Sequence, residues 1–340
     1  MGKQLSQYVC ARIVRMDDAD IGLFDYDRNN TLYYFIMNAD ERIYMRYGGR
    51  DSQSQDSYLN LDSLAIALKQ GLELHRQSKS GELKPQPRPA PLFAREMPML
   101  AERTFTQNRC VECHLIGDYQ NLQREKDGTL DKLSHMYRSP DLKTIGITLD
   151  VPKGLVAKEV KGSVEAAGMK TGDRITALNG LPVWTFGDLQ YQYDKVNRQA
   201  TSISLTVARE DRLVEIPVVL PALWWWSDIR WRQSSVDPRL YFEARPLSEA
   251  EKRQWELKSS GFASMVKSVD SFAQMTKSHD LKVGDIVFGV DGVESDDVAS
   301  NVELYIKLHK TPGDSVSLDI IRGGKRMKMP LRTYRMSFRK

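Results

Sequence analysis

An internal repeat constrains the fold of this chain more than any other feature of its sequence. The segment AGMKTGDRITALNGLPV, which begins at Ala167, matches HDLKVGDIVFGVDGVES, which begins at His279, without gaps. Lys, Gly, Asp and Gly recur at the same places in both segments, at a constant offset of 112 residues. A gapless repeat at constant offset indicates a duplicated structural unit.

Each matched segment is followed by the same succession of patterns. Apolar residues then occur at helical spacing, at Phe186, Leu189 and Val196 in the first copy and at Val298, Val302, Tyr305 and Leu308 in the second. Two strand-like stretches follow, SISLTVA and LVEIPVVL in the first copy and VSLDIIR and KRMKMPL in the second. Each copy is therefore predicted to contain a helix followed by a β-hairpin.

The repeated units resemble bacterial PDZ domains, and GSVEAAGMKTGDRITALNG (162–180) and LKVGDIVFGVDG (281–292) carry the resemblance. It implies that each unit binds an extended peptide by strand addition beside its helix. It also implies that backbone N–H groups receive the carboxylate of the peptide. The residues implied at these positions are Ile145, Gly146 and Ile147 in the first copy and Ser260, Gly261 and Phe262 in the second.

An alternative stays open for each copy: neighbouring chain closes the groove, and the unit serves only as a scaffold. The Trp-rich stretch WWWSDIRWR (224–232), between the copies, is a candidate for the covering element. Proteases often carry PDZ domains, but the sequence contains no G-x-S-x-G nucleophile motif and is too short upstream for a protease domain. An enzyme is not expected.

CVECH, at 110–114, is the sharpest chemical signal in the chain. Two thiols at this spacing reach the two vinyl groups of one haem, and the adjacent histidine then lies under the iron. Cys110 and Cys113 are therefore the predicted attachment points of haem c, and His114 is its predicted proximal iron ligand. The candidates for the sixth iron ligand are Met97, Met99, His135 and Met136.

Three other interpretations of the motif stay open. The two cysteines could form a disulfide or a redox-active thiol pair. A zinc site would need a fourth ligand and is awkward with a cysteine and a histidine adjacent. The pair could also be purely structural, and Cys10 is expected to be a buried thiol because it lies in an apolar strand pattern.

The order of parts resembles a group of bacterial proteins, common in planctomycete-like bacteria, that combine a thioredoxin-like region, a CxxCH segment and PDZ modules. YVCARIV, the stretch at 24–51, CVECH and SDIRWRQSS carry this resemblance. It implies an incomplete thioredoxin-like domain, because the paired cysteines and the cis-proline of that fold are missing here.

The expected fold class is α+β multidomain, with a partial thioredoxin-like α/β domain, a small helical CxxCH segment and two PDZ-like β-barrel domains. The expected parts are the thioredoxin-like domain (1–79), a Pro-rich linker (80–98), the CxxCH segment (99–140), the first PDZ-like domain (141–222), a Trp-rich connector (223–258) and the second PDZ-like domain (259–334).

Net charge and the length of the apolar runs indicate neither a nucleic acid partner nor a transmembrane segment. Lys and Arg number 49 against 45 Asp and Glu, and this net charge of +4 is too small to indicate nucleic acid. The longest apolar run, VVLPALWWW, is far shorter than the ~20 residues that span a bilayer, so no transmembrane segment is expected.

The sequence therefore predicts a periplasmic or secreted c-type haem protein that passes electrons to a redox partner protein and binds peptides or protein C-termini through two PDZ modules. Haem c is attached outside the cytoplasm, so a leader is expected to have been removed from this chain. The alternative functions are a cofactor-free PDZ scaffold with the CxxC as a structural disulfide, and a thiol–disulfide redox protein.

Overall fold

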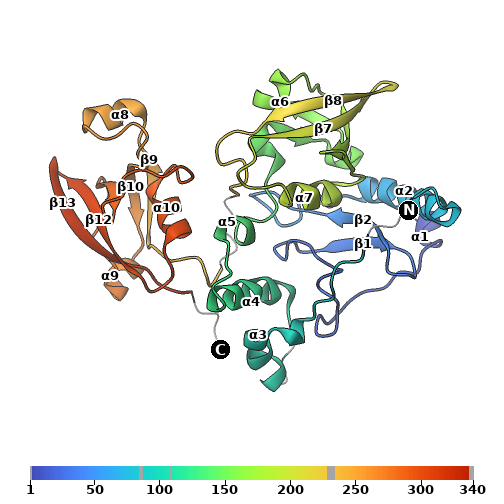
Figure 1. The fold of residues 1–340 in the computed structure, drawn as a ribbon, viewed down its shortest axis with the longest axis horizontal. Helices are drawn as coiled ribbons and strands as arrows, with labels where there is room; N and C mark the ends of the chain where they lie inside the picture. The colour runs from blue at the N-terminus through green and yellow to red at the C-terminus, as the bar shows by residue number, and fades with distance from the viewer. Residues whose placement is uncertain (1, 84–86, 108, 110, 228–233, 337–340) are drawn as a thin grey trace. The chain divides into compact units, whose positions relative to one another are not determined.

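Two structural units make up the chain, residues 1–232 and residues 233–340. The computed structural model describes residues 2–83, 87–107, 109, 111–227 and 234–336. Figure 1 shows the elements of each unit. None of the described helices combines the length and the apolar character that a bilayer span requires.

A β-hairpin and a long helix form the start of the first unit. The elements are α1 (Gly2–Leu5), β1 (Tyr33–Met37), β2 (Ile43–Gly48) and α2 (Leu61–Ser80). β1 pairs antiparallel with β2, and α2 packs against the hairpin through an apolar cluster that includes Ile36, Met45 and Leu74. The Asn60 side chain caps α2, and Gly81, with φ at 81°, ends it. The strand patterns TLYYFIM and RIYMRYGG predict this hairpin, and LDSLAIALKQGLELH, with Asn60 or Asp62 near its cap, predicts this helix; both are present.

Cys10 does not lie in a strand. The segment around it is irregular, and Cys10 is exposed, as is the neighbouring Val9, at 98%. The expectation of a buried thiol is therefore wrong, because the apolar residues that follow Tyr8 here, Val9, Ile13 and Val14, are exposed as well. The described residues of this region form a two-stranded sheet, and they do not show a thioredoxin-like domain.

Short helices follow in the segment with the CxxCH motif. They are η1 (Ala94–Glu96), α3 (Pro98–Arg103), η2 (Phe105–Gln107), α4 (Cys113–Lys126) and α5 (Lys132–His135). α3 packs against α4 around an apolar cluster that includes Met97, Leu100 and Ile116. The stretches LAERTFTQNRC and LDKLSHMY predict a helix on each side of the motif, and α3 and α5 are present there.

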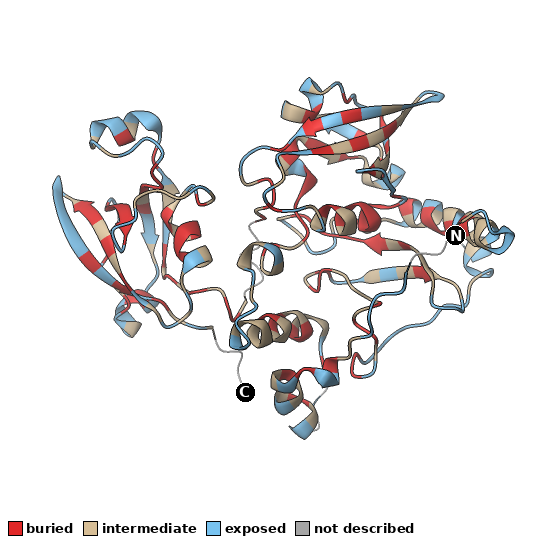
Figure 2. Cartoon of the chain, viewed as in Figure 1, coloured by how far each residue is buried: buried red, intermediate tan, exposed pale blue. Residues whose placement is uncertain are grey.

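The first copy of the repeat completes the first unit. Its elements are η3 (Leu142–Ile145), β3 (Ile147–Leu149), η4 (Val151–Lys153), β4 (Ala157–Val160), α6 (Gly162–Ala166), β5 (Arg174–Leu178), β6 (Leu181–Pro182), α7 (Phe186–Asp194), β7 (Ser202–Arg209) and β8 (Arg212–Val219). β3 and β4 form one sheet, and β6, β5, β7 and β8 form a second in that order. Every second residue is buried from Ile203 to Val207 of β7, and buried and exposed residues alternate from Ile216 to Val219 of β8 (Figure 2).

The second copy forms a single antiparallel sheet. Its elements are β9 (Phe242–Pro246), α8 (Glu249–Gln254), β10 (Ser264–Val269), α9 (Phe272–Thr276), β11 (Ile286–Val290), α10 (Val302–His309), β12 (Ser315–Arg322) and β13 (Lys325–Arg332). The strand order is β13-β12-β11-β10-β9, so the end strands do not pair with each other. In the part of the chain that the structure describes, both copies are open sheets, and the expected closed β-barrels are not formed.

A buried ion pair recurs at the repeat. Asp173 accepts hydrogen bonds from Nε and Nη2 of Arg209 at 2.8 and 2.7 Å. Asp285 accepts the same two bonds from Arg322 at 2.8 and 2.6 Å. Both carboxylates are almost fully buried, at 1% and 2% exposed. The duplication that the sequence indicates is thus a duplication of stabilising contacts as well as of strands.

The turn after each matched strand also recurs. Asn179 and Gly180 have φ of 48° and 76°, and Asp291 and Gly292 have φ of 52° and 82°. In each copy the Asn or Asp side chain accepts a backbone N–H from the next strand of the sheet, that of Ser204 or its counterpart, at 2.8 Å. Asn, Asp and Gly are the residues that tolerate this left-handed backbone, which explains why the motif ends in Asn-Gly or Asp-Gly.

Candidate functional site

The first copy has a groove face on α7. Phe186, Gln190 and Tyr193 lie on one side of α7 because they follow helical spacing. All three are buried, at 6%, 3% and 0% exposed. This face of α7 is therefore covered, and the contacts described next show that residues 46–58 and Trp224 cover it.

The segment that leaves β2 lies along α7 (Figure 1). The Arg46 N–H donates to Asp188 Oδ1 at 2.7 Å, and the Arg46 carbonyl accepts from the Thr185 hydroxyl. Further along, Gln190 Nε2 donates to the Arg50 carbonyl at 2.8 Å and Gln190 Oε1 accepts the Arg50 N–H at 3.3 Å. Side chains of α7 thus bind the backbone of residues 46–50 as they would bind an extended peptide.

Aromatic rings complete the cover. Phe186 stacks on Tyr58 with ring centroids 3.3 Å apart, and Tyr193 packs on Trp224 at 4.9 Å. The Thr144 hydroxyl also donates to the Trp224 carbonyl at 2.9 Å. The Trp-rich stretch expected as a covering element therefore contributes Trp224, and residues 46–58 contribute the rest.

The covering segment ends at the loop predicted to hold a peptide carboxylate. Lys143 forms an ion pair with Asp51 at 2.7 Å, and the Ser52 N–H donates to Asp141 at 3.3 Å. The chain therefore runs from the start of α7 toward this loop, which is the direction required of a peptide whose C-terminus reaches it.

Ile145, Gly146 and Ile147, the residues predicted to receive a peptide carboxylate in the first copy, contact other parts of the chain. Ile145 and Ile147 are buried, at 1% and 0% exposed. Gly146 has φ at 90°, and its N–H donates to the Lys143 carbonyl at 3.1 Å. A Cβ at Gly146 would lie 2.0 Å from the Lys161 carbonyl oxygen, so only glycine fits here.

In the second copy, β9 takes the place of β3. β3 pairs with β4 through Ile147 opposite Val160, and β9 pairs with β10 through Phe242 opposite Val269. The Gly146 carbonyl accepts the Lys161 N–H, and the Tyr241 carbonyl accepts the Asp270 N–H in the same way. Tyr241 also has a positive φ, at 59°. The counterpart of Ile145, Gly146 and Ile147 is therefore Leu240, Tyr241 and Phe242.

The residues predicted from sequence for this role lie elsewhere. Ser260, Gly261 and Phe262 precede β10, and Phe262 is 1% exposed and stacks on Tyr305 of α10 at 4.6 Å. The structure thus places Phe262 in the core. Sequence reasoning missed Tyr241 because the pattern sought a glycine, whereas a tyrosine occupies the left-handed position here.

The open edge of β9 faces α10. Val266, opposite Ala244, bonds through its N–H and carbonyl to Asp285 and Gly284, so the N–H of Ala244 points away from β10. The carboxylate of Glu303, on α10, accepts this N–H. The second copy therefore has a strand edge whose N–H is held by a side chain rather than by another strand.

The CxxCH motif is described only in part, because Cys110 lies outside the described residues. Cys113 begins α4 and contacts the apolar cluster that also contains Met97. His114 Nε2 lies 3.3 Å from the Glu112 carboxylate. Of the four sixth-ligand candidates, the structure places Met97 in the same cluster as Cys113.

The other sixth-ligand candidates lie toward the far end of α4. Asn121 Nδ2 donates to the His135 carbonyl at 3.2 Å, and the Met99 N–H donates to Gln123 at 3.4 Å. Asn121 is seven residues after His114, which is roughly 10 Å along a helix. Met136 directly follows His135 and ends α5. Met99, His135 and Met136 are therefore not gathered at His114.

Apolar residues surround Cys113 in the described part of the motif. Met97, Val111, Leu115 and Ile116 are each buried in one packed cluster beside Cys113. Within the described ranges, no group of three or more His, Cys, Asp or Glu side chains is arranged to hold a metal ion.

No protein-family model matches the chain, and no curated protein matches it. Among solved structures, the HtrA-type protease AlgW with decapeptide is 14% identical over 49% of this chain and 56% of its own, with a TM-score of 0.26. A PDZ domain of a carboxy-terminal protease from Vibrio cholerae, in complex with peptide, is 14% identical over 30% of this chain and 98% of its own, with a TM-score of 0.21.

A serine endoprotease from Yersinia pestis is 14% identical over 41% of this chain and 44% of its own, with a TM-score of 0.22. The chain thus spans about half the length of the whole proteases that it matches. At these TM-scores the matches do not establish a shared activity.

The contact between α7 and residue 46 predicts a pH dependence of stability. Burial raises the pKa of Asp188 to about 6, although the N–H groups of Arg46 and Trp184 lower it. The folded protein then holds a proton that the unfolded chain releases near pH 4. The free energy of unfolding should therefore fall as pH rises from about 4 to about 6, by up to about 3 kcal/mol.

Urea unfolding at several pH values tests this expectation. Asp188→Asn should flatten the wild-type fall between pH 4 and pH 6, because the amide keeps an acceptor for Arg46 but does not titrate. The exposed Asp62→Asn serves as the control and should keep the wild-type profile. A profile of Asp188→Asn parallel to the wild type would contradict the assignment.

Proposed function

We propose that the chain binds extended peptides or protein C-termini in its second copy, in the groove between β9 and α10. The observation that carries the proposal is the Ala244 N–H, which faces α10 from the end strand of the sheet. A peptide added to this edge would offer a carbonyl to that N–H and continue the sheet.

Glu303 holds the place of the peptide carbonyl. Its carboxylate accepts the Ala244 N–H, so a peptide has to displace it before the backbone can pair. The cost is moderate, because Glu303 lies only partly buried and water can solvate the released carboxylate. Tyr241, with its left-handed backbone, precedes this edge as Gly146 precedes β3.

The first copy acts as a scaffold in this proposal. Residues 46–52 already lie against α7 and reach the loop at 141–143. A peptide would have to remove a covalently connected segment, whose effective concentration beside the groove is high. Peptide binding is therefore assigned to the second copy alone.

The test is selection of C-terminal peptides from a display library on the full-length chain, followed by titration of the best peptide. Ala244→Pro should weaken binding at least about tenfold, because proline lacks the N–H. The ladder to β10 should survive, since that N–H points away from it and β9 already contains Pro246. Glu303→Ala should bind a few-fold tighter, and Glu303→Gln, which keeps an acceptor, should stay near the wild type.

Ser260→Pro is the matched control, because it removes an exposed N–H at the loop predicted from the sequence. It should leave the affinity unchanged, and circular dichroism should show that all variants fold. Equal binding by the wild type and Ala244→Pro, or loss of binding only in Ser260→Pro, would refute the assignment to β9.

Covalent haem c at Cys110 and Cys113 stays a prediction of the motif, and so do electron transfer to a redox partner and a periplasmic or secreted location. The chain, fused to a secretion leader and co-expressed with a cytochrome c maturation system, should then show a reducible α-band that survives denaturation. A colourless, folded protein would refute haem attachment. A thiol titration under denaturant would next separate the disulfide from free thiols.

A further inference from the structure

A polar cavity of about 750 Å³ lies in the first unit. Residues of α4, α5 and the end of α7 line it, together with the loops near residues 22 and 138. Its cationic side chains are Arg124, Arg138, Lys195 and Arg198. Its carboxylates are Asp25, Asp131 and Asp194. Four cations against three carboxylates leave one positive charge in the lining.

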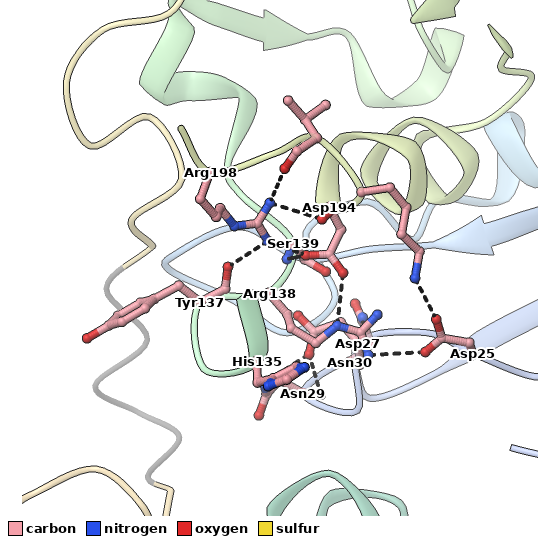
Figure 3. Close-up of polar contacts among 12 residues, drawn as sticks. Asp25, Asp27, Asn29, Asn30, His135, Tyr137, Arg138, Ser139, Asp194 and Arg198 are labelled. Carbon is pink, nitrogen blue, oxygen red and sulfur yellow. Dashed lines mark hydrogen bonds and ion pairs between the residues drawn. The ribbon is translucent and has the colours of Figure 1, made fainter. Parts of the chain in front are cut away.

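Two carboxylates already serve three of the cations (Figure 3). Asp194 accepts from Arg138 Nε at 2.9 Å and from Arg198 Nη2 at 2.8 Å. Asp25 accepts from Arg138 Nη1 at 3.1 Å and from Lys195 Nζ at 3.2 Å. These contacts neutralise part of the charge and fix the positions of the side chains around the cavity.

Asp131, the third carboxylate, stabilises the start of a helix. Asp131 caps α5 by accepting the Leu133 N–H at 3.0 Å and the Ser134 hydroxyl at 2.6 Å. His135, in the same turn, has a lowered pKa because of its burial and the nearby charge of Arg124. His135 is therefore neutral near pH 7 and does not add to the positive charge.

Arg124 is the cation without a carboxylate. Its Nη1 donates to Asn121 Oδ1 at 3.0 Å, and among the described residues it makes no ion pair. Burial and the neighbouring Arg138 lower its pKa more than the charge of Asp25 raises it. A partly buried guanidinium in this position is destabilised unless an anion lies against it.

Arg198 supplies a second donor that lacks a partner. Its side chain is 4% exposed, and its Nε is buried with no hydrogen-bond partner among the described residues. A buried donor left in this state costs free energy. The unpartnered Nε of Arg198 is closed to solvent and therefore to a ligand, so Arg198 contributes to the cavity through its charge, whereas Arg124 is only partly buried.

We propose that this cavity binds a small organic anion through a carboxylate or phosphate oxyanion, with Arg124 as its main contact. The guanidinium of an arginine matches the geometry of either oxyanion. The single surplus positive charge fits one anionic group. The cavity is far larger than an inorganic ion, and the amides of Gln120 and Gln199 in its lining suit a polar remainder of the ligand.

The experiment titrates the full-length chain with glycerol 3-phosphate and with lactate at constant ionic strength, by ³¹P line broadening and by calorimetry. At least one probe should bind saturably to the wild type, and Arg124→Gln should weaken that binding about tenfold or more. Lys126→Gln is the matched control, because it removes the same charge from an exposed position two residues along α4. It should bind like the wild type.

A second measurement keeps the proposal open to refutation if Arg124→Gln fails to fold. Whichever probe binds should be displaced from the wild type by a second anion of its own class, acetate for lactate or inorganic phosphate for glycerol 3-phosphate, whereas neutral lactamide should displace neither. The probe that binds separates a carboxylate ligand from a phosphate ligand. Absence of saturable binding by both probes, equal weakening in Arg124→Gln and Lys126→Gln, or displacement by lactamide would overturn the proposal.

Discussion

The arrangement of the first unit depends on one buried ion pair, between Arg50 and Asp27. Arg50 Nε lies 2.5 Å from Asp27 Oδ2, and both side chains are almost completely buried. The same guanidinium donates to the Arg138 carbonyl at 2.9 Å and to the Ser227 hydroxyl at 3.4 Å. Removal of one partner from such a pair costs about 3–5 kcal/mol, because a buried charge is left uncompensated.

This interaction also determines which groove is free. Gln190 of α7 binds the backbone of Arg50 while the Arg50 side chain is held by Asp27. The backbone of residues 46–50 is thus hydrogen-bonded to α7, while the Arg50 side chain binds Asp27. A competing peptide would have to break the Gln190 and Asp188 contacts of a segment that is fixed in place. The second copy has no such cover described, and only the Glu303 side chain holds the N–H of Ala244.

Local patterns in the sequence predicted much of the fold. The repeat, the hairpin at 33–48 and the helix capped by Asn60 follow from spacing and capping residues, and the structure contains all three. The strand opposite β10 could not be predicted in this way. An insertion that contains α8 separates β9 from β10, and Tyr241 occupies a left-handed position without the glycine that would have indicated it.

The sequence also could not predict the contacts that fill the first groove. Arg50 and Gln190 are separated by 140 positions, and neither belongs to a local motif. The arginines of the polar cavity lie on α4, on the loop after α7 and on the loop before η3, so only the folded chain brings them together. The CxxCH motif differs from these contacts, because it is a local pattern that the sequence shows directly. In the structure, Cys113 contacts a buried apolar cluster.

The central claim is that the second groove binds peptide while the first remains filled by residues 46–52. Hydrogen–deuterium exchange of the full-length chain, with and without a saturating selected peptide, tests it most directly. The account predicts that the peptide protects fragments covering 240–246 and 302–309 and leaves 43–50 and 185–194 unchanged. Protection of 185–194 together with faster exchange in 43–50 would show that the peptide displaces the internal segment, and it would contradict the account.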